Sequence, residues 1–147
     1  GKLPTKEAKD EVKLECANAI LNYERFMADK KFHQVINCVD VFVRNINKYW
    51  VKNYNDNATE EDKLQLIADT LQYIYVANLL LHPIGPVGTK KVCDYLGFEE
   101  SKAFSWDYAF ANYYEVFKDA TSPKVVTLQE KEDFFRKHPS QLAQFAE

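Results

Sequence analysis

The sequence has little of what β-architectures, disulfide frameworks and membrane anchors require. Four glycines and five prolines in 147 residues are too few for a turn-rich β-protein. The three cysteines, Cys16, Cys38 and Cys93, are odd in number and form no Cys-x-x-Cys pair, which argues against a disulfide framework and a zinc site. There is no signal-peptide pattern and no apolar run near membrane-spanning length. These absences predict an all-α protein of the reducing cytoplasm with no membrane partner.

Motifs for catalysis or cofactor binding are also missing. The chain has no Gly-x-x-x-x-Gly-Lys phosphate loop, no His-Glu-x-x-His, no Gly-x-Ser-x-Gly and no paired-glycine dinucleotide loop. The acidic run from Glu60 to Asp62 suits a helix start, since consecutive helical side chains point in different directions and cannot converge. We expect His82, just before Pro83, to bond a carbonyl at a helix end. The sequence therefore predicts no catalytic residue, no cofactor and no metal site in this chain.

Apolar and aromatic residues are abundant instead. Hydrophobic residues make up 46% of the chain and aromatic residues 14%, enough for the core of one soluble domain. Apolar spacing predicts helices over residues 6–27, 32–52, 60–81, 89–95 and 106–117. We expect Thr59 and Ser105 to cap the third and fifth helices and Gly97 to close the fourth.

A change of composition near Asp119 predicts two parts. Residues 1–118 form a helical bundle, and residues 119–147 form a more polar C-terminal extension. Within the extension we expect an extended Val125-Val126 and short helices over residues 130–136 and 139–146.

The second predicted helix carries two distinct faces. We expect its apolar stripe to be buried, and the stripe comprises Phe32, Val35, Ile36, Val39, Val43, Ile46 and Trp50. Arg44, Lys48 and Lys52 recur every fourth residue and share another face. Periodicity alone favours a solvated face on which Asp40 and Arg44 form an ordinary ion pair. The alternative is contact with the phosphates of a nucleic acid.

The end of this helix offers further groups that suit RNA. Asparagine side chains can hydrogen-bond base edges, and aromatic rings stack on unpaired bases. Trp50 has core packing as its competing role, whereas Tyr54 lies in a predicted loop. The net charge of −3 counts mildly against non-specific nucleic-acid binding. The candidate RNA-binding residues are Arg44, Asn47, Lys48, Trp50, Lys52 and Tyr54.

The order of elements resembles a known family. The segment KFHQVINCVDVFVRNINKYW, followed after a polar loop by EDKLQLIADTLQYIYVANLLLHPIGPVGTKKVCDYLGF, resembles the anticodon-binding domain of methionyl-tRNA synthetase. The shared pattern is a helix ending in Asn47-Lys48-Tyr49, a loop, a long apolar helix, a break from Pro83 to Pro86, and a short helix ending in Leu96-Gly97. The resemblance covers roughly residues 11–98, and it implies the helical bundle found in class I aminoacyl-tRNA synthetases.

The resemblance also implies a function. A domain of this family binds the anticodon stem of a tRNA, here methionine tRNA, and supports its aminoacylation. This chain lacks the nucleotide-binding catalytic domain, so methionine–tRNA ligase activity would belong to a longer parent protein. The loop after Tyr49 has no Pro-Trp pair, which the family carries there for anticodon contact. A helical module that has lost RNA binding and contacts a protein partner therefore stays open as the alternative.

Overall fold

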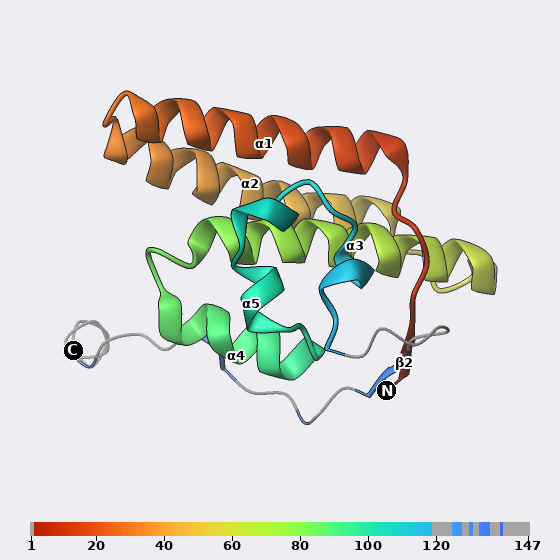
Figure 1. Ribbon diagram of the computed structural model, residues 1–147. Helices are drawn as coiled ribbons and strands as arrows, with labels where there is room; N and C mark the ends of the chain where they lie inside the picture. The colour runs from red at the N-terminus through yellow and green to blue at the C-terminus, as the bar shows by residue number, and fades with distance from the viewer. Residues whose placement is uncertain (1, 119–124, 128–129, 131–132, 136–138, 140–147) are drawn as a thin grey trace.

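The computed structural model shows a predominantly helical bundle (Figure 1) and describes residues 2–118, 125–127, 130, 133–135 and 139. The helices are α1 (Asp10–Ala28), α2 (Phe32–Asn53), α3 (Glu60–Leu81), α4 (Pro86–Leu96) and α5 (Glu100–Ala103). Two 3-10 turns follow, η1 (Trp106–Tyr108) and η2 (Tyr113–Val116). Strands β1 (Lys2–Pro4) and β2 (Val125–Thr127) form a small antiparallel ladder. The ladder is an addition to the predicted all-α class, and Val125-Val126 is extended as expected.

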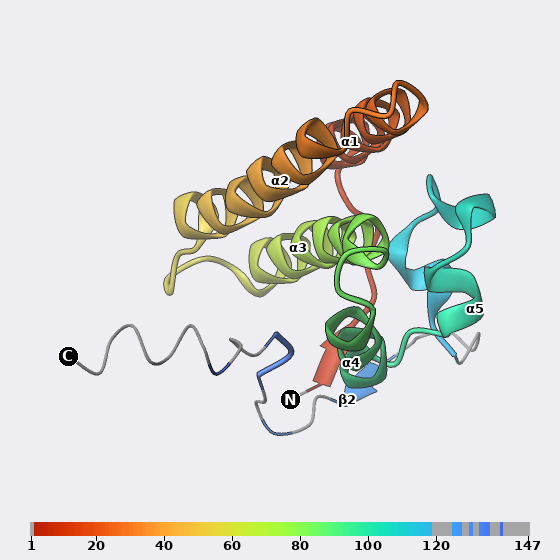
Figure 2. The ribbon, with the colours of Figure 1, turned by 90° about the vertical axis from the view of Figure 1, so that its left-hand side faces the viewer.

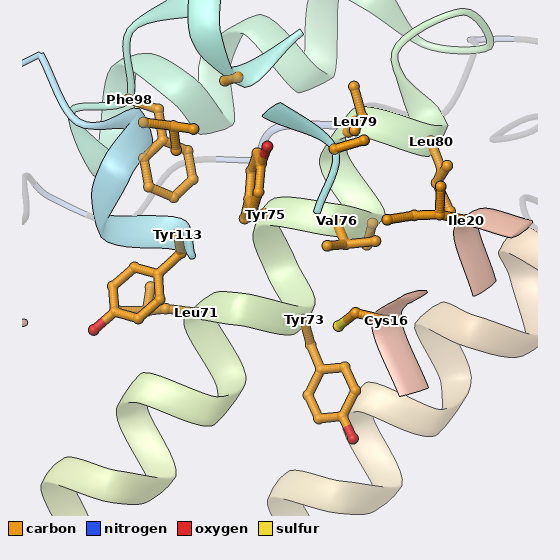
Figure 3. Packing of buried hydrophobic residues seen from close by; sticks show 14 of the residues in the cluster. Cys16, Ile20, Leu71, Tyr73, Tyr75, Val76, Leu79, Leu80, Phe98 and Tyr113 are labelled. Atoms are coloured by element: carbon orange, nitrogen blue, oxygen red, sulfur yellow. The ribbon is translucent and has the colours of Figure 1, made fainter. Parts of the chain in front are cut away.

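Helix α3 lies at the centre of the bundle. The antiparallel helices α1 and α2 pack on one side of it, and α4 lies on the other (Figures 1 and 2). Every residue from Tyr75 to Leu80 is buried, as expected of a helix with neighbours on opposite sides. Figure 3 shows Tyr73 beside Cys16 on one side, and Tyr75 with Phe98 and Tyr113 on the other. Within the described ranges, α3 alone is long and apolar enough to cross a membrane, but 67% of its most apolar stretch is buried inside the bundle.

The helix ends follow local sequence signals. The hydroxyl of Thr59 accepts a hydrogen bond of 3.2 Å from the Asp62 backbone N–H, and that of Ser105 accepts one of 3.3 Å from Asp107. Gly97 has a φ of 76° and closes α4 in the left-handed conformation. The predicted caps at Thr59 and Gly97 are confirmed, and Ser105 caps the short turn η1 in place of the longer helix that was expected there. Lys30 also adopts a positive φ, 57°, in the tight connection between α1 and α2.

Two predicted helices differ from the structure because of tertiary hydrogen bonds. A continuous helix over residues 106–117 is wrong, since the Gln72 side chain accepts from the Tyr113 N–H at 2.8 Å and donates to the Ala111 carbonyl at 3.1 Å. Those bonds satisfy backbone groups that a helix would pair internally. The first helix begins at Asp10 rather than residue 6, because Lys6 bonds the Tyr113 hydroxyl through both its N–H and its carbonyl.

Part of the predicted core is exposed. Phe32 is 59% exposed, Ile36 55% and Val43 39%, so the expected burial of these three residues on α2 is wrong. Both α1 and α3 contact α2, and the residues of α2 that are buried are Val35, Val39 and Phe42.

The C-terminal extension is described only in pieces. Glu130 and residues 133–135 are not helical, and the rest of the predicted helix over 130–136 lies outside the described residues. So does the predicted helix over 139–146, apart from Pro139. The ring of Phe134 packs edge-on against Tyr95 of α4, with centroids 5.2 Å apart. The described part of the extension therefore contacts the bundle.

Candidate nucleic-acid interface

The cationic face of α2 is present at the surface. Arg44, Lys48 and Lys52 are all exposed and lie one helical turn apart. Arg44 Nη2 lies 3.0 Å from Asp40 Oδ2, so the expected i,i+4 ion pair is there. Among the described residues, neither Lys48 nor Lys52 has an ion-pair partner. Two ammonium groups thus point to solvent near the end of the helix.

The two candidate stacking residues lie against each other. The rings of Trp50 and Tyr54 stack with centroids 5.6 Å apart and an interplanar angle of 27°. Trp50 is partly buried, whereas Tyr54 is 52% exposed. The Tyr54 hydroxyl donates to the Asp56 carboxylate, and this bond raises the pKa of Tyr54. Tyr54 is therefore neutral at physiological pH, and its exposed side can take a further ring.

The asparagines near this helix end differ in how far their side chains are engaged. The Asn53 amide donates to the Tyr49 carbonyl at 2.8 Å, and Asn55 Oδ1 accepts from the Asn57 N–H at 2.9 Å. Both bonds stabilise the helix end and the following turn. Asn47 is exposed and lies six residues before the end of α2 at Asn53. Among these residues Asn47 is thus the freest to bond a ligand.

The structure adds a residue to this site that the sequence did not indicate. Asp69 on α3 is 1% exposed and lies directly beneath the end of α2. Its carboxylate accepts hydrogen bonds from the Tyr49 hydroxyl at 2.8 Å, from the Lys9 backbone N–H at 2.9 Å and from the Gln65 amide at 2.9 Å. Burial, then the bond to Asp69, raises the pKa of Tyr49. One signal was available, since Asp69 is the only charged residue between Leu64 and Leu81.

Two hollows flank the end of α2. A polar pocket of about 290 Å³ is lined by Lys9, Tyr49, Asn53, Asn55, Ala58, Asp62, Gln65, Leu66 and Asp69. On the other side, an apolar groove of about 360 Å³ is lined by Val43, Ile46, Asn47, Trp50, Thr70, Ile74, Ala77, Asn78, Leu81, Val92 and Phe135. Among the described residues, no charged side chain lines this apolar groove. Trp50 and Asn47 are part of its wall, whereas Lys48 and Lys52 do not line it.

The cysteines and histidines that the structure describes lie in separate surroundings. Within the described part of the chain, no three His, Cys, Asp or Glu side chains converge to hold a metal ion. Burial raises the pKa of the Cys16 thiol, and it raises that of Cys93 to about 12. His82 has a structural role, but its partner differs from the expected carbonyl: Nδ1 lies 2.8 Å from the Thr89 hydroxyl, and the ring stacks on Phe104.

Comparison with known proteins adds no relative. The chain matches no model of a known protein family, and no curated protein matches it. The family stays a prediction.

Proposed function

We propose that this chain is a tRNA-binding module related to the anticodon-binding domain of methionyl-tRNA synthetase. The observation that carries the proposal is that Lys48 and Lys52 are exposed and have no ion-pair partner among the described residues, with the half-exposed ring of Tyr54 just after the end of the same helix. The order of α2, loop, α3, break and α4 agrees with the pattern on which the resemblance rests.

In this proposal each group has a separate part in binding. Lys48 and Lys52 neutralise phosphates and release counterions, which makes binding weaken as salt rises. Tyr54 stacks on an unpaired base with the side of its ring that Trp50 leaves open, and such stacking tolerates any base. Arg44 contributes after its guanidinium exchanges the exposed Asp40 carboxylate for a phosphate, a small loss because surface ion pairs are weak. The chain binds and orients RNA and carries out no chemistry.

The test is a fluorescence-anisotropy titration with labelled methionine tRNAs, initiator and elongator, at several salt concentrations. The double charge reversal Arg44→Glu with Lys48→Glu should abolish binding. A matched double reversal elsewhere, Arg25→Glu with Lys118→Glu, changes the net charge equally and should leave most of the affinity. Lys52→Ala should make the slope of log affinity against log salt shallower by about 1, the change expected when one phosphate contact is lost. Absence of binding at tens of micromolar protein in low salt would refute the proposal.

A second candidate function is supported by the apolar groove. The described residues of its lining carry no charge, and on α2 the exposed Phe32 and Ile36 extend the apolar surface beyond it. An uncharged exposed apolar surface of this kind is typical of protein–protein contacts. In this alternative the bundle binds a partner protein through the groove, without RNA. In a pull-down with nuclease-treated lysate, Val43→Asp should then abolish binding of the protein partner. The double reversal of Arg44 and Lys48 should leave that binding unchanged.

A further inference from the structure

The carboxylate of Asp69 ties together three segments that are distant in sequence. Its Oδ2 accepts from Tyr49 on α2, and its Oδ1 accepts from the Lys9 N–H before α1 and from Gln65 one turn earlier on α3. Gln65 also donates to the Glu7 carbonyl at 3.0 Å. Burying a carboxylate costs a large desolvation free energy unless hydrogen bonds compensate it. The Asp69 carboxylate receives three such hydrogen bonds, so the three donors and the carboxylate form one buried polar network.

The connection from Asp69 to the candidate interface runs through Tyr49. Tyr49 lies between Lys48 and Trp50 in the sequence, and its carbonyl accepts the Asn53 amide at 2.8 Å. One residue further on, the backbone carbonyl of Trp50 accepts a hydrogen bond of 2.8 Å from the Tyr54 backbone N–H. Helix ends have unsatisfied carbonyls and fray unless side chains or tertiary contacts hold them. With its hydroxyl fixed to α3, Tyr49 sets the rotation of this last turn.

We propose that Asp69 is the positioning residue of the RNA-binding surface and acts on it through the Tyr49 hydroxyl. Asp69 touches no RNA. It holds the last turn of α2 so that Lys48 and Lys52 point to solvent while the Trp50–Tyr54 stack stays closed. The RNA part of this inference rests on the proposed function, whereas the ordering of the helix end does not.

The experiment uses Trp50 as a local probe. The chain has two tryptophans, so Trp106→Phe leaves the emission of Trp50 alone. In that background, Tyr49→Phe removes only the hydroxyl, and Asp69→Asn replaces an acceptor oxygen by a donor. Tyr73→Phe is the matched control, because Tyr73 also donates to a carboxylate, Glu15 at 2.5 Å, and its ring lies 5.2 Å from that of Tyr49. Iodide quenching of Trp50 is measured without RNA, and tRNA affinity by anisotropy.

Tyr49→Phe and Asp69→Asn should each increase the quenching of Trp50 and weaken tRNA binding about three- to tenfold, the range that one hydrogen bond supports. The double variant should bind no more weakly than Asp69→Asn, since the Tyr49 hydroxyl acts only through Asp69. Tyr73→Phe should change neither readout. If Asp69→Asn fails to fold, Tyr49→Phe alone decides. Unchanged quenching in Tyr49→Phe, or an equal change in Tyr73→Phe, overturns the inference. If the parent binds no tRNA, the proposed function fails, and quenching still decides whether Asp69 holds the helix end.

Discussion

The three cysteine thiols differ in how deeply they are buried. Cys16 and Cys93 are buried within the core, whereas Cys38 is half-buried on α2 and donates to the Val35 carbonyl at 3.1 Å. Burial raises the pKa of all three thiols. The thiolate is the reactive form, so each thiol is less reactive at neutral pH than a free cysteine.

We expect Cys38 alone to react with a disulfide reagent such as DTNB in the folded protein. Because its pKa is raised, the rate should be slow at pH 8 and should keep rising as the pH passes the ordinary thiol pKa. Cys16 and Cys93 should react only after denaturation, since the reagent cannot reach them. Absorbance of the released thiolate counts the thiols that have reacted, and Cys38→Ser should remove the reaction seen before denaturation. Equal rates for all three thiols would contradict this prediction.

At the scale of elements, signals within a few residues were sufficient for most of the bundle. Thr59, Ser105 and Gly97 are local caps, and their roles followed from residue type and position. The four-residue spacing of Arg44, Lys48 and Lys52 correctly placed them on one face.

Other features could not be predicted, because they depend on residues that are distant in the sequence. Gln72 breaks the expected helix after Trp106 by bonding residues about forty positions away. Asp69 likewise acquires its role only when Lys9 and Tyr49 meet it in the fold. Exposure of Phe32 and Ile36 also depends on how the neighbouring helices pack, which periodicity does not specify.

The contact between α4 and the C-terminal extension requires a glycine. A Cβ at Gly88 would lie 2.3 Å from Phe135 Cε1 and 2.9 Å from the Phe134 carbonyl oxygen. No side chain fits there while these two residues stay in place. The absence of a side chain at position 88 is therefore what allows Phe134 and Phe135 to pack on α4.

Gly88→Val should detach Phe134 and Phe135 from α4 with little effect on the helices. Chymotrypsin should then cleave after these phenylalanines faster than in the parent, as mass spectrometry of early fragments would show. Gly97→Ala is the matched control: its Cβ has open space, but φ is +76°, so it strains the helix end and leaves the extension in place. An unchanged cleavage rate in Gly88→Val would count against the docking.

On the scale of the whole molecule, aromatic rings join the central helix to the elements beside α4. Phe98 is fully buried, and its ring lies 6.0 Å from that of Tyr75 on α3 and 5.1 Å from that of Phe117. Phe98 also forms an isolated backbone bridge with Phe117. These contacts predict that the bundle unfolds as one cooperative unit.

Phe98→Ala should lower the free energy of unfolding by about 3–5 kcal/mol, because it removes a buried ring and leaves a cavity. Urea unfolding followed by circular dichroism and by tryptophan emission should give coincident transitions in the parent. Phe110→Ala is the control, since Phe110 is 60% exposed and exposed substitutions change stability by about 0.5 kcal/mol or less. Two separated transitions in the parent would contradict the prediction that the bundle unfolds as one cooperative unit.

The β1–β2 ladder has a mechanical consequence. Lys2 pairs with Thr127 and Pro4 with Val125, so the chain enters and leaves this ladder at the same end. A force that pulls Lys2 and Thr127 apart therefore loads the backbone hydrogen bonds one after another, as in opening a zipper, rather than all together in shear. In a single-molecule stretching experiment through these two positions, the ladder should open first and at low force, while the bundle around α3 stays folded.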